Sequence, residues 1–295
     1  GSEKYRRQPA QSTPSRSLRH ADMIPYGWIQ ATKGIIVSDV PIEFPLRWAR
    51  EAGAIALRSF NHAVAQRKPD HTWVTEADVT IERLLVSRIT DHFPTHGIIG
   101  EEQTRRTIDH EFLWAIDPLD GTAIFLAGLP TWGVSSGLLR HGQPYLGVIY
   151  LPLLNDCYWS VPGSGAFWND QLIHVAAPRP CTSDDWISTP STAHRRYTID
   201  FIGKTRSIGA TIGAFCYTAR GSAIGALINT FAIWDVAAGL AILQAAGGVA
   251  AELSGTLFDV RTILDGSTFT TPVLLGAPEY LAVLHKNIHL RTPAL

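Results

Sequence analysis

Two aspartates three positions apart are the residues of this chain that most clearly predict chemistry. They belong to Asp117-Pro118-Leu119-Asp120-Gly121-Thr122, directly after the apolar residues 112–116, which have the pattern of a buried strand. Pro118 fixes its own φ and pushes Asp117 toward extended backbone, and Gly121 allows a backbone that other residues resist. Carboxylate oxygens bind Mg²⁺, and the N–H groups of a tight turn suit a phosphate. The alternative is an ordinary Asp-Pro-x-Asp-Gly surface turn.

Two further acidic segments favour the metal-binding interpretation. The apolar residues 98–99 are followed by Gly100-Glu101-Glu102, which again places carboxylates at the end of a predicted strand. Residues 233–239 place Asp235 at the start of an apolar helix, where helix N-capping is the alternative role. Because α/β proteins place their sites at the ends of such elements, the three segments predict one cluster of carboxylates.

Composition indicates one large enzyme-like body and excludes several other classes. A chain of 295 residues with 45% hydrophobic residues can bury a large core, as one domain or two lobes. The net charge of −1 gives no electrostatic signature for nucleic acid or an anionic membrane. No apolar run reaches the roughly 18–20 residues of a membrane span. The cysteines Cys157, Cys181 and Cys216 are odd in number and widely spaced without a Cys-x-x-Cys motif, which fits a reducing compartment and predicts that they are small buried hydrophobic residues.

Residues 1–40 differ in composition from the rest. Residues 3–20 are rich in Arg, Ser, Gln and Pro and contain one acid, which favours a flexible tail or an arm that packs on a partner subunit. A targeting segment for an organelle is the alternative, although a clear apolar face is missing.

The body of the chain alternates between helical and strand patterns. Residues 46–60 carry an apolar stripe with helical spacing that includes Leu57, and a second helix is expected to begin just after Asp78. Strands are expected at 131–139, 145–150, 156–160, 186–188 and 249–252, and helices at 209–219 and 234–246. The Pro-rich residues 177–180 predict a boundary between an N-terminal α+β lobe, 41–177, and a C-terminal α/β lobe, 178–295, which supplies Asp235.

Taken together, these motifs resemble the inositol monophosphatase family of Mg²⁺-dependent, lithium-sensitive phosphatases. Gly100-Glu101-Glu102, residues 114–122 and residues 234–239 carry the resemblance, and residues 74–78 and 165–170 are similar to two further family elements. The resemblance extends over about residues 44–285. It implies an α/β fold with a layered αβαβα sandwich and hydrolysis of a small phosphate monoester. It also implies a cytoplasmic homodimer that binds neither nucleic acid nor membrane.

The resemblance also implies a set of metal ligands. Glu101, Asp117 and the main-chain carbonyl of Leu119 would hold one ion, and Asp117, Asp120 and Asp235 would hold a second. Two or three Mg²⁺ ions are expected, with Mn²⁺ as the alternative. An all-oxygen donor set, with no competing Cys or His cluster, favours these ions over Zn²⁺.

Catalytic and phosphate-binding roles follow from the same resemblance. Asp78 and Thr122 would orient a water bound to the first metal and help to deprotonate it, and Glu101 would act through that metal. The N–H groups of Gly121 and Thr122 would bind phosphate oxygens. Asp78 has an alternative role as the N-cap of the helix that follows it. Arg67 and Lys68 lie near a basic position of the family, with a solvated loop as the alternative.

Substrate choice is predicted less directly. Inositol-specific members carry an acid where this chain has Ile228, which argues against an inositol phosphate. Residues 68–70, 74–78 and 125–133 look more like the histidinol-phosphate phosphatase branch. A 3′-phosphoadenosine 5′-phosphate or sugar-phosphate phosphatase is the alternative. Ser191 and Arg206 lie where the family builds its substrate wall.

Two alternatives come from other functional classes. Residues 133–137 match the Gly-x-Ser-x-Gly pattern around Ser135, and Asp259 and His285 follow in the order of a serine hydrolase. That enzyme would need a strand–turn–helix context, whereas the motif lies within a strand pattern that leads into a hairpin. A regulatory protein on an inactive phosphatase scaffold is disfavoured because every acid of the implied metal site is present.

Overall fold

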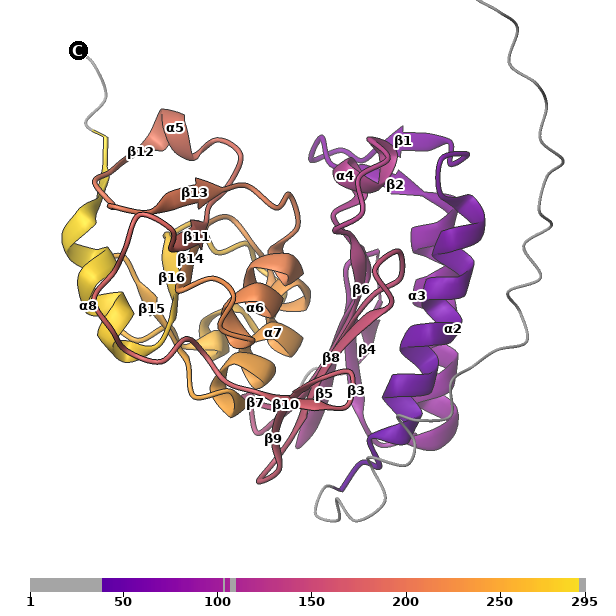
Figure 1. Cartoon of the computed structure of the whole chain (residues 1–295). Coiled ribbons are helices and arrows are strands. Elements are labelled where there is room, and N and C mark those ends of the chain that lie inside the picture. The colour runs from indigo at the N-terminus through magenta and orange to yellow at the C-terminus, as the bar shows by residue number, and fades with distance from the viewer. Residues whose placement is uncertain (1–38, 103, 107–109, 292–295) are drawn as a thin grey trace, which may run out of the picture.

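Helices and sheets alternate in layers across this molecule. The computed structural model describes residues 39–291 apart from 103 and 107–109, so the tail expected for residues 1–40 lies almost wholly outside the described residues. Figure 1 shows, from right to left, a pair of helices, a large sheet, a second pair of helices, a small sheet and a last helix. This confirms the predicted layered αβαβα sandwich.

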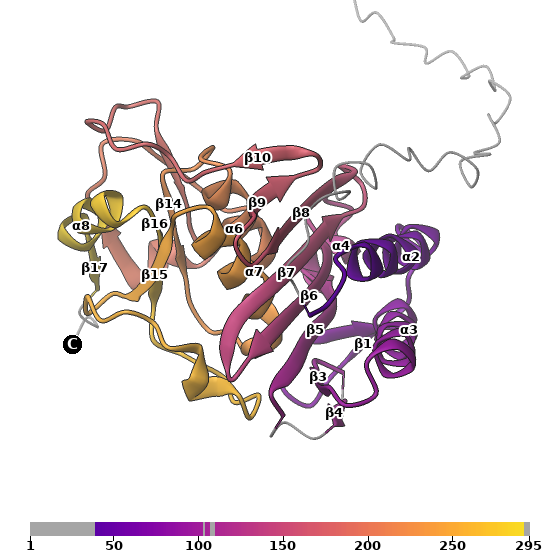
Figure 2. The ribbon, with the colours of Figure 1, turned by 90° about the horizontal axis from the view of Figure 1, so that it is seen from below.

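The outer helices α2 (Glu43–Ser59) and α3 (Glu76–His92) cover one face of the large sheet (Figures 1 and 2). The buried side of α2 includes Trp48, Ala52 and Ala56, which recur at the helical spacing of four residues. Leu57 is 40% exposed, so the prediction that it belongs to the apolar stripe is wrong.

The large sheet contains eight described strands. Most neighbouring strands are antiparallel, whereas β3 (Gly97–Gly100) and β5 (Phe112–Asp120) are parallel to each other. The strands predicted at 131–139, 145–150 and 156–160 are β6, β7 and β8, with ends within two residues of the prediction. The spatial order is β10 (Gln171–Ile173), β9 (Gly165–Trp168), β8 (Asp156–Val161), β7 (Gln143–Leu151), β6 (Gly133–Arg140), β5 (Phe112–Asp120), β3 (Gly97–Gly100) and β4 (Arg105–Arg106).

The helices α6 (Thr211–Ala219) and α7 (Ile233–Ala245) form the middle layer. Helix α7 lies on β6 and β7 where Gly137 and Gly147 stand opposite each other. A Cβ on Gly137 would lie 2.4 Å from the amide nitrogen of Ala238, and one on Gly147 would lie 2.3 Å from its carbonyl oxygen. The helix therefore approaches the sheet this closely only because both positions lack a side chain.

The small sheet has the described strand order β13 (Lys204–Arg206), β11 (Trp186–Ser188), β14 (Gly225–Ile228), β16 (Val273–Gly276) and β15 (Val249–Glu252). Helix α8 (Pro278–Asn287) covers its outer side (Figure 1). Two short pairs complete the described sheets, β1 (Ala65–Arg67) with β2 (Trp73–Thr75), and β12 (Tyr197–Ile199) with β17 (Ile288–Leu290).

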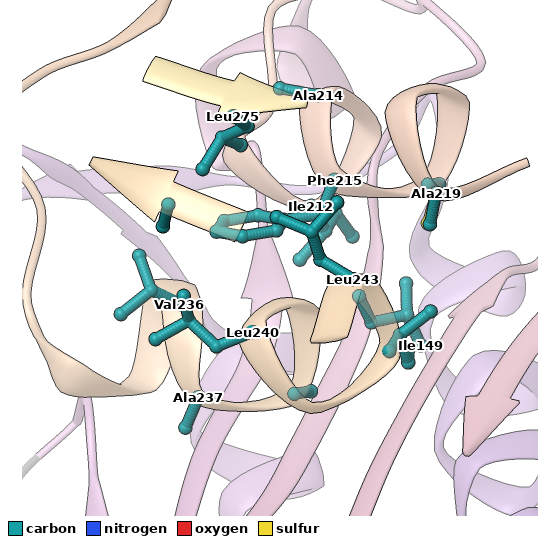
Figure 3. Close-up of a cluster of buried hydrophobic side chains, with 14 of the residues drawn as sticks. Ile149, Ile212, Ala214, Phe215, Ala219, Val236, Ala237, Leu240, Leu243 and Leu275 are labelled. Atoms are coloured by element: carbon teal, nitrogen blue, oxygen red, sulfur yellow. The ribbon is translucent and has the colours of Figure 1, made fainter. Parts of the chain in front are cut away.

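The two predicted lobes share one hydrophobic core. The chain crosses from the large sheet to the small one within residues 174–185. Figure 3 shows the shared core, in which Ile149 of the large sheet, Phe215 and Leu243 of the middle helices and Leu275 of the small sheet belong to one cluster. The two middle helices therefore pack against both sheets.

Two further observations bear on predictions made from composition. All three cysteines are free thiols; Cys157 and Cys216 are buried, as predicted, whereas the prediction of burial is wrong for Cys181, which is half-buried. Within the described residues, every helix is too short or too polar to cross a membrane.

The close approach of α7 to the sheet gives a stability prediction. We expect Gly137→Ala to lower the free energy of unfolding by about 1–3 kcal/mol, because the new methyl group must displace the backbone of Ala238. Urea denaturation followed by circular dichroism measures this change. Ser136→Ala on the same buried strand is the control, and equal stability of the two variants would contradict the explanation.

Candidate metal centre

Three carboxylates from distant parts of the chain meet at one end of the large sheet. Asp117 and Asp120 come from the end of β5, and Asp235 comes from the first turn of α7. One ligand oxygen from each lies within 4.8 Å of the others. With Mg²⁺–oxygen distances of about 2.1 Å, a single ion has room to contact all three residues.

Backbone amides hold each of these acids in place. The amide of Leu119 donates to Asp117 Oδ1 at 2.9 Å, and the amide of Ile212, in the first turn of α6, donates to Asp120 Oδ2 at 2.7 Å. The amide of Ala232 donates to Asp235 Oδ2 at 2.6 Å. Asp235 therefore caps its own helix while it faces the other acids, so the two roles considered for it are compatible.

Burial and mutual repulsion set the protonation of the three acids. Burial raises the pKa of Asp117 and Asp235 well above the ordinary value, and the charges of neighbouring carboxylates raise each pKa further. Burial is also the main reason that the pKa of Asp120 rises to about 7. No lysine or arginine of the described residues forms an ion pair with the three acids. Such a donor set fits one or more divalent cations, which would supply the missing positive charge.

Glu101 lies beside this cluster and is bound by a lysine. Lys68 Nζ is 2.8 Å from Glu101 Oε1 and 2.5 Å from Glu102 Oε1. Burial alone would lower the pKa of Lys68, but the two glutamates raise it above its usual value. Burial raises the pKa of Glu102 to about 7. Arg67 instead lies over the ring of Trp73, 4.3 Å from its centroid, so Lys68 is the basic residue of this pair that reaches the acids.

Asp78 and Thr122 are linked by a hydrogen bond. Asp78 Oδ1 is 3.2 Å from the Thr122 hydroxyl oxygen, which lies 3.1 Å from the carbonyl oxygen of Leu119. Asp78 Oδ2 accepts a hydrogen bond from the amide of Thr75 at 2.8 Å. The helix begins at Glu76, so the prediction that it begins after Asp78 is wrong; Asp78 is the third helical residue and closes a capping box. Burial raises its pKa.

The turn after β5 is built around Gly121. Gly121 has φ of +86°, which favours glycine, and immediately precedes α4 (Thr122–Leu126). A Cβ on Gly121 would lie 3.0 Å from the Cβ of Ala210, so the turn packs against the segment that leads into α6.

A cavity of about 170 Å³ adjoins this turn. Its lining includes Ser191, Ile228 and the backbone segment 209–211, and no residue of the lining is charged. Ile228 therefore faces the cavity, as the substrate argument requires. Arg206 is exposed on the edge strand β13, its guanidinium lies 5.7 Å from the centroid of the Trp186 ring, and it is not among the lining residues.

Comparison with known proteins identifies the family. The model of the inositol monophosphatase family matches residues 40–289. The chain belongs to the inositol monophosphatase family. It is 32% identical over 229 residues to a fructose-1,6-bisphosphatase/inositol-1-monophosphatase of Aquifex aeolicus, a match that covers 74% of this chain and 86% of the relative. It is 33% identical over 236 residues to a histidinol-phosphatase of Chlorobaculum parvum, covering 76% and 89%.

Solved structures give the same result. The structure of a Thermotoga maritima IMPase aligns with a TM-score of 0.73 and 25% identity, over 83% of this chain and 95% of that one. Members of the inositol monophosphatase family are Mg²⁺-dependent hydrolases of phosphoric monoesters, so the predicted enzyme class is confirmed.

The structure excludes the serine hydrolase alternative. Ser135 lies in the middle of β6 with no exposed surface, and its hydroxyl has no hydrogen-bond partner among the described residues. Asp259 pairs with Arg261, and His285 Nε2 lies 2.9 Å from the carbonyl oxygen of Glu252. The three members of the suspected triad therefore have unrelated surroundings.

Glu82 is a residue that the sequence analysis missed. It is 5% exposed on α3, one turn after Asp78, and its Oε2 accepts a hydrogen bond from the amide of Glu102 at 2.7 Å. Its Oε1 accepts from the amide and the hydroxyl of Thr104 at 3.0 and 2.6 Å. Glu82 thus holds the loop that carries Glu101 at two positions, Glu102 and Thr104. The i, i+4 spacing from Asp78 was the signal that could have identified it.

The raised pKa values predict how the folding stability of the metal-free enzyme depends on pH. The folded pKa of Asp120 is about 7, whereas its ordinary value is 3.8. Between these values the unfolded chain loses a proton that the folded protein keeps, so stability should fall as pH rises from 4 to 7. Melting temperatures in chelator should show this decline, and Mg²⁺ should remove it. Asp120→Asn should flatten the decline, and an unchanged pH profile in that variant would contradict the assignment.

The role of Glu82 gives a second prediction. Glu82→Gln keeps the size of the side chain but removes its charge, so the loop should lose about 1.5–3 kcal/mol of charge-assisted hydrogen bonding. We expect roughly tenfold weaker Mg²⁺ binding by calorimetry. Glu76→Gln, at an exposed position on the same helix, is the matched control. Wild-type Mg²⁺ affinity in Glu82→Gln would show that the loop is positioned by other contacts.

Proposed function

We propose that this protein is a Mg²⁺-dependent phosphomonoesterase that hydrolyses a small phosphorylated metabolite with water as the nucleophile. The observation that carries the proposal is the meeting of three carboxylates within 4.8 Å, two of them at the end of β5. These acids have no ion-pair partner among the described lysines and arginines, and membership of a phosphatase family supports the same chemistry.

The proposed metal ligands are Asp117, Asp120, Asp235, Glu101 and the carbonyl oxygen of Leu119. When bound there, Mg²⁺ would lower the pKa of a coordinated water and neutralise charge on the leaving oxygen. Both the loop of Glu101 and the backbone of Leu119 adjoin acids of the cluster, since the charge of Glu101 contributes to the raised pKa of Asp117 and the Leu119 amide binds Asp117.

The remaining residues would orient the nucleophile and the phosphate. The Thr122 hydroxyl lies within hydrogen-bond distance of both Asp78 and the carbonyl of Leu119, so it can pass a proton from a bound water toward Asp78. The raised pKa of Asp78 makes its carboxylate a better proton acceptor. The amides of Gly121 and Thr122, in the turn that follows the acids, would bind phosphate oxygens.

The cavity beside the turn supports an uncharged body for the substrate. Ile228 is 5% exposed and lines the cavity together with Asn229, Ser188 and Ser191. The amide of Asn229 and the hydroxyls of Ser188 and Ser191 can hydrogen-bond to hydroxyls, but the lining provides no carboxylate for an inositol ring. We therefore propose that inositol-1-phosphate is a poor substrate, and that histidinol phosphate, sugar phosphates and 3′-phosphoadenosine 5′-phosphate are the candidates.

Phosphate release in the presence of Mg²⁺ or excess chelator tests the proposal. We expect hydrolysis only with Mg²⁺. Asp117→Asn, which removes the central charge of the cluster, should lower kcat/KM by at least about a hundredfold, the size of effect seen when one group that stabilises charge in a transition state is lost. The control is Asp259→Asn, which changes an aspartate that pairs with Arg261 outside the site. Full activity in chelator, or in Asp117→Asn at saturating Mg²⁺, would overturn the proposed function.

A further inference from the structure

The connection between β14 and α7 contains a residue in an unusual backbone conformation. Thr230 has φ of +56°, in the left-handed region that favours glycine. A β-branched residue is especially rare there, because its side chain crowds the backbone. Strained residues of this kind persist only where the surrounding structure fixes them, and they concentrate at functional sites. The backbone of Thr230 therefore makes residues 229–232 a candidate functional segment.

Contacts on both sides hold the connection in this conformation. Before it, Ile228 at the end of β14 pairs with β16. After it, Phe231 and Phe269 exchange two backbone hydrogen bonds of 3.0 and 2.8 Å, and the amide of Ala232 donates to the carboxylate of Asp235. The two residues between these contacts are thus fixed from both ends.

Asn229 directly precedes the strained residue and lines the cavity beside the acids. It is half-buried, and no group of the described residues forms a hydrogen bond with its carboxamide. A carboxamide carries two N–H donors and an acceptor oxygen with two lone pairs. All of these groups are therefore available to a ligand in the cavity.

The neighbours of Asn229 in the lining make its chemistry distinctive. Leu227 and Ile228, from β14, contribute apolar side chains, whereas Ser188 and Ser191 contribute hydroxyls with a single donor each. Among the described residues of the lining, Asn229 is the only one with a carboxamide. Because its backbone is fixed before a ligand binds, little conformational entropy is lost when the carboxamide forms hydrogen bonds.

We propose that Asn229 is a specificity-determining residue of this phosphatase, which binds hydroxyl groups on the body of the substrate. The inference rests on the proposed function and deepens it. With the phosphate at the acids, the body of the ester lies in the cavity, where one carboxamide can both donate to and accept from neighbouring hydroxyls. A body without hydroxyls leaves the carboxamide without a partner, and a site built to bind a hydroxyl discriminates against such an analogue.

Two esters with the same carbon skeleton test this inference. Glucitol 6-phosphate and hexyl phosphate are both six-carbon primary phosphate esters, and they differ only in the hydroxyls of the body. With Mg²⁺, kcat/KM should be tenfold or more higher for glucitol 6-phosphate, mainly through a lower KM; tenfold corresponds to about 1.4 kcal/mol. The Ki of inorganic phosphate, which has no body to fill the cavity, measures binding at the acids separately.

Two variants connect this preference with Asn229. Asn229→Leu keeps the size of the side chain and Asn229→Ala shortens it, and both remove the carboxamide. Each should lower the glucitol-to-hexyl ratio of kcat/KM about tenfold and leave the Ki of inorganic phosphate within twofold. Gln244→Ala, which removes an exposed carboxamide near the C-terminal end of α7 outside this lining, is the matched control. Because the readout is a ratio within each variant, a loss of folded protein does not mimic the expected result.

Four results would overturn the inference. The first is an equal kcat/KM for the two esters, or hydrolysis of neither while inositol-1-phosphate, histidinol phosphate or 3′-phosphoadenosine 5′-phosphate is hydrolysed. The second is a ratio within twofold of wild type in both Asn229 variants, and the third is an equal fall of the ratio in Gln244→Ala. The fourth is a tenfold rise in the Ki of phosphate, which would place the effect at the acids. If the proposed function fails, no phosphate ester is hydrolysed with Mg²⁺, and both proposals fall together.

Discussion

The concentration of buried negative charge at the end of β5 is the constraint on which the rest of the structure depends. Asp117, Asp120 and Asp235 face one another within 4.8 Å, and burial and repulsion raise all three pKa values. Such a cluster is unfavourable in the isolated protein, so the surrounding fold must hold it together. Three backbone amides, one for each acid, supply part of that restraint.

The packing of the middle layer brings the third acid to the other two. Asp235 lies more than a hundred residues after Asp120 along the chain, and it reaches β5 because α7 lies directly on the large sheet. That contact requires the glycine pair of Gly137 and Gly147, which leave the sheet surface bare beneath Ala238. The stability of this helix–sheet contact and the geometry of the site are therefore coupled: a side chain that lifts α7 also moves Asp235 away from its partners.

Charge is distributed unevenly around the site, and this bears on how substrate and metal bind. Lys68 contacts Glu101, the three acids form the cluster beside it, and the cavity next to the turn of Gly121 is lined by uncharged residues. Glu82 holds the loop of Glu101 by accepting hydrogen bonds from the backbone amides of Glu102 and Thr104.

The sequence by itself determined the acids, the strand ends that carry them and the layered fold, because these depend on local patterns of apolar residues and turns. Predictions from local sequence patterns were wrong where contacts between distant segments determine the structure. The residues near Asp78 did not reveal that the helix starts at Glu76, three residues before the predicted start. Leu57 continued the apolar stripe in sequence but is exposed in the packed structure, and Arg206 lies over Trp186. The tertiary structure alone decided that Lys68 rather than Arg67 contacts Glu101, and that Glu82 holds the loop of Glu101, since those contacts join parts of the chain that no local pattern relates.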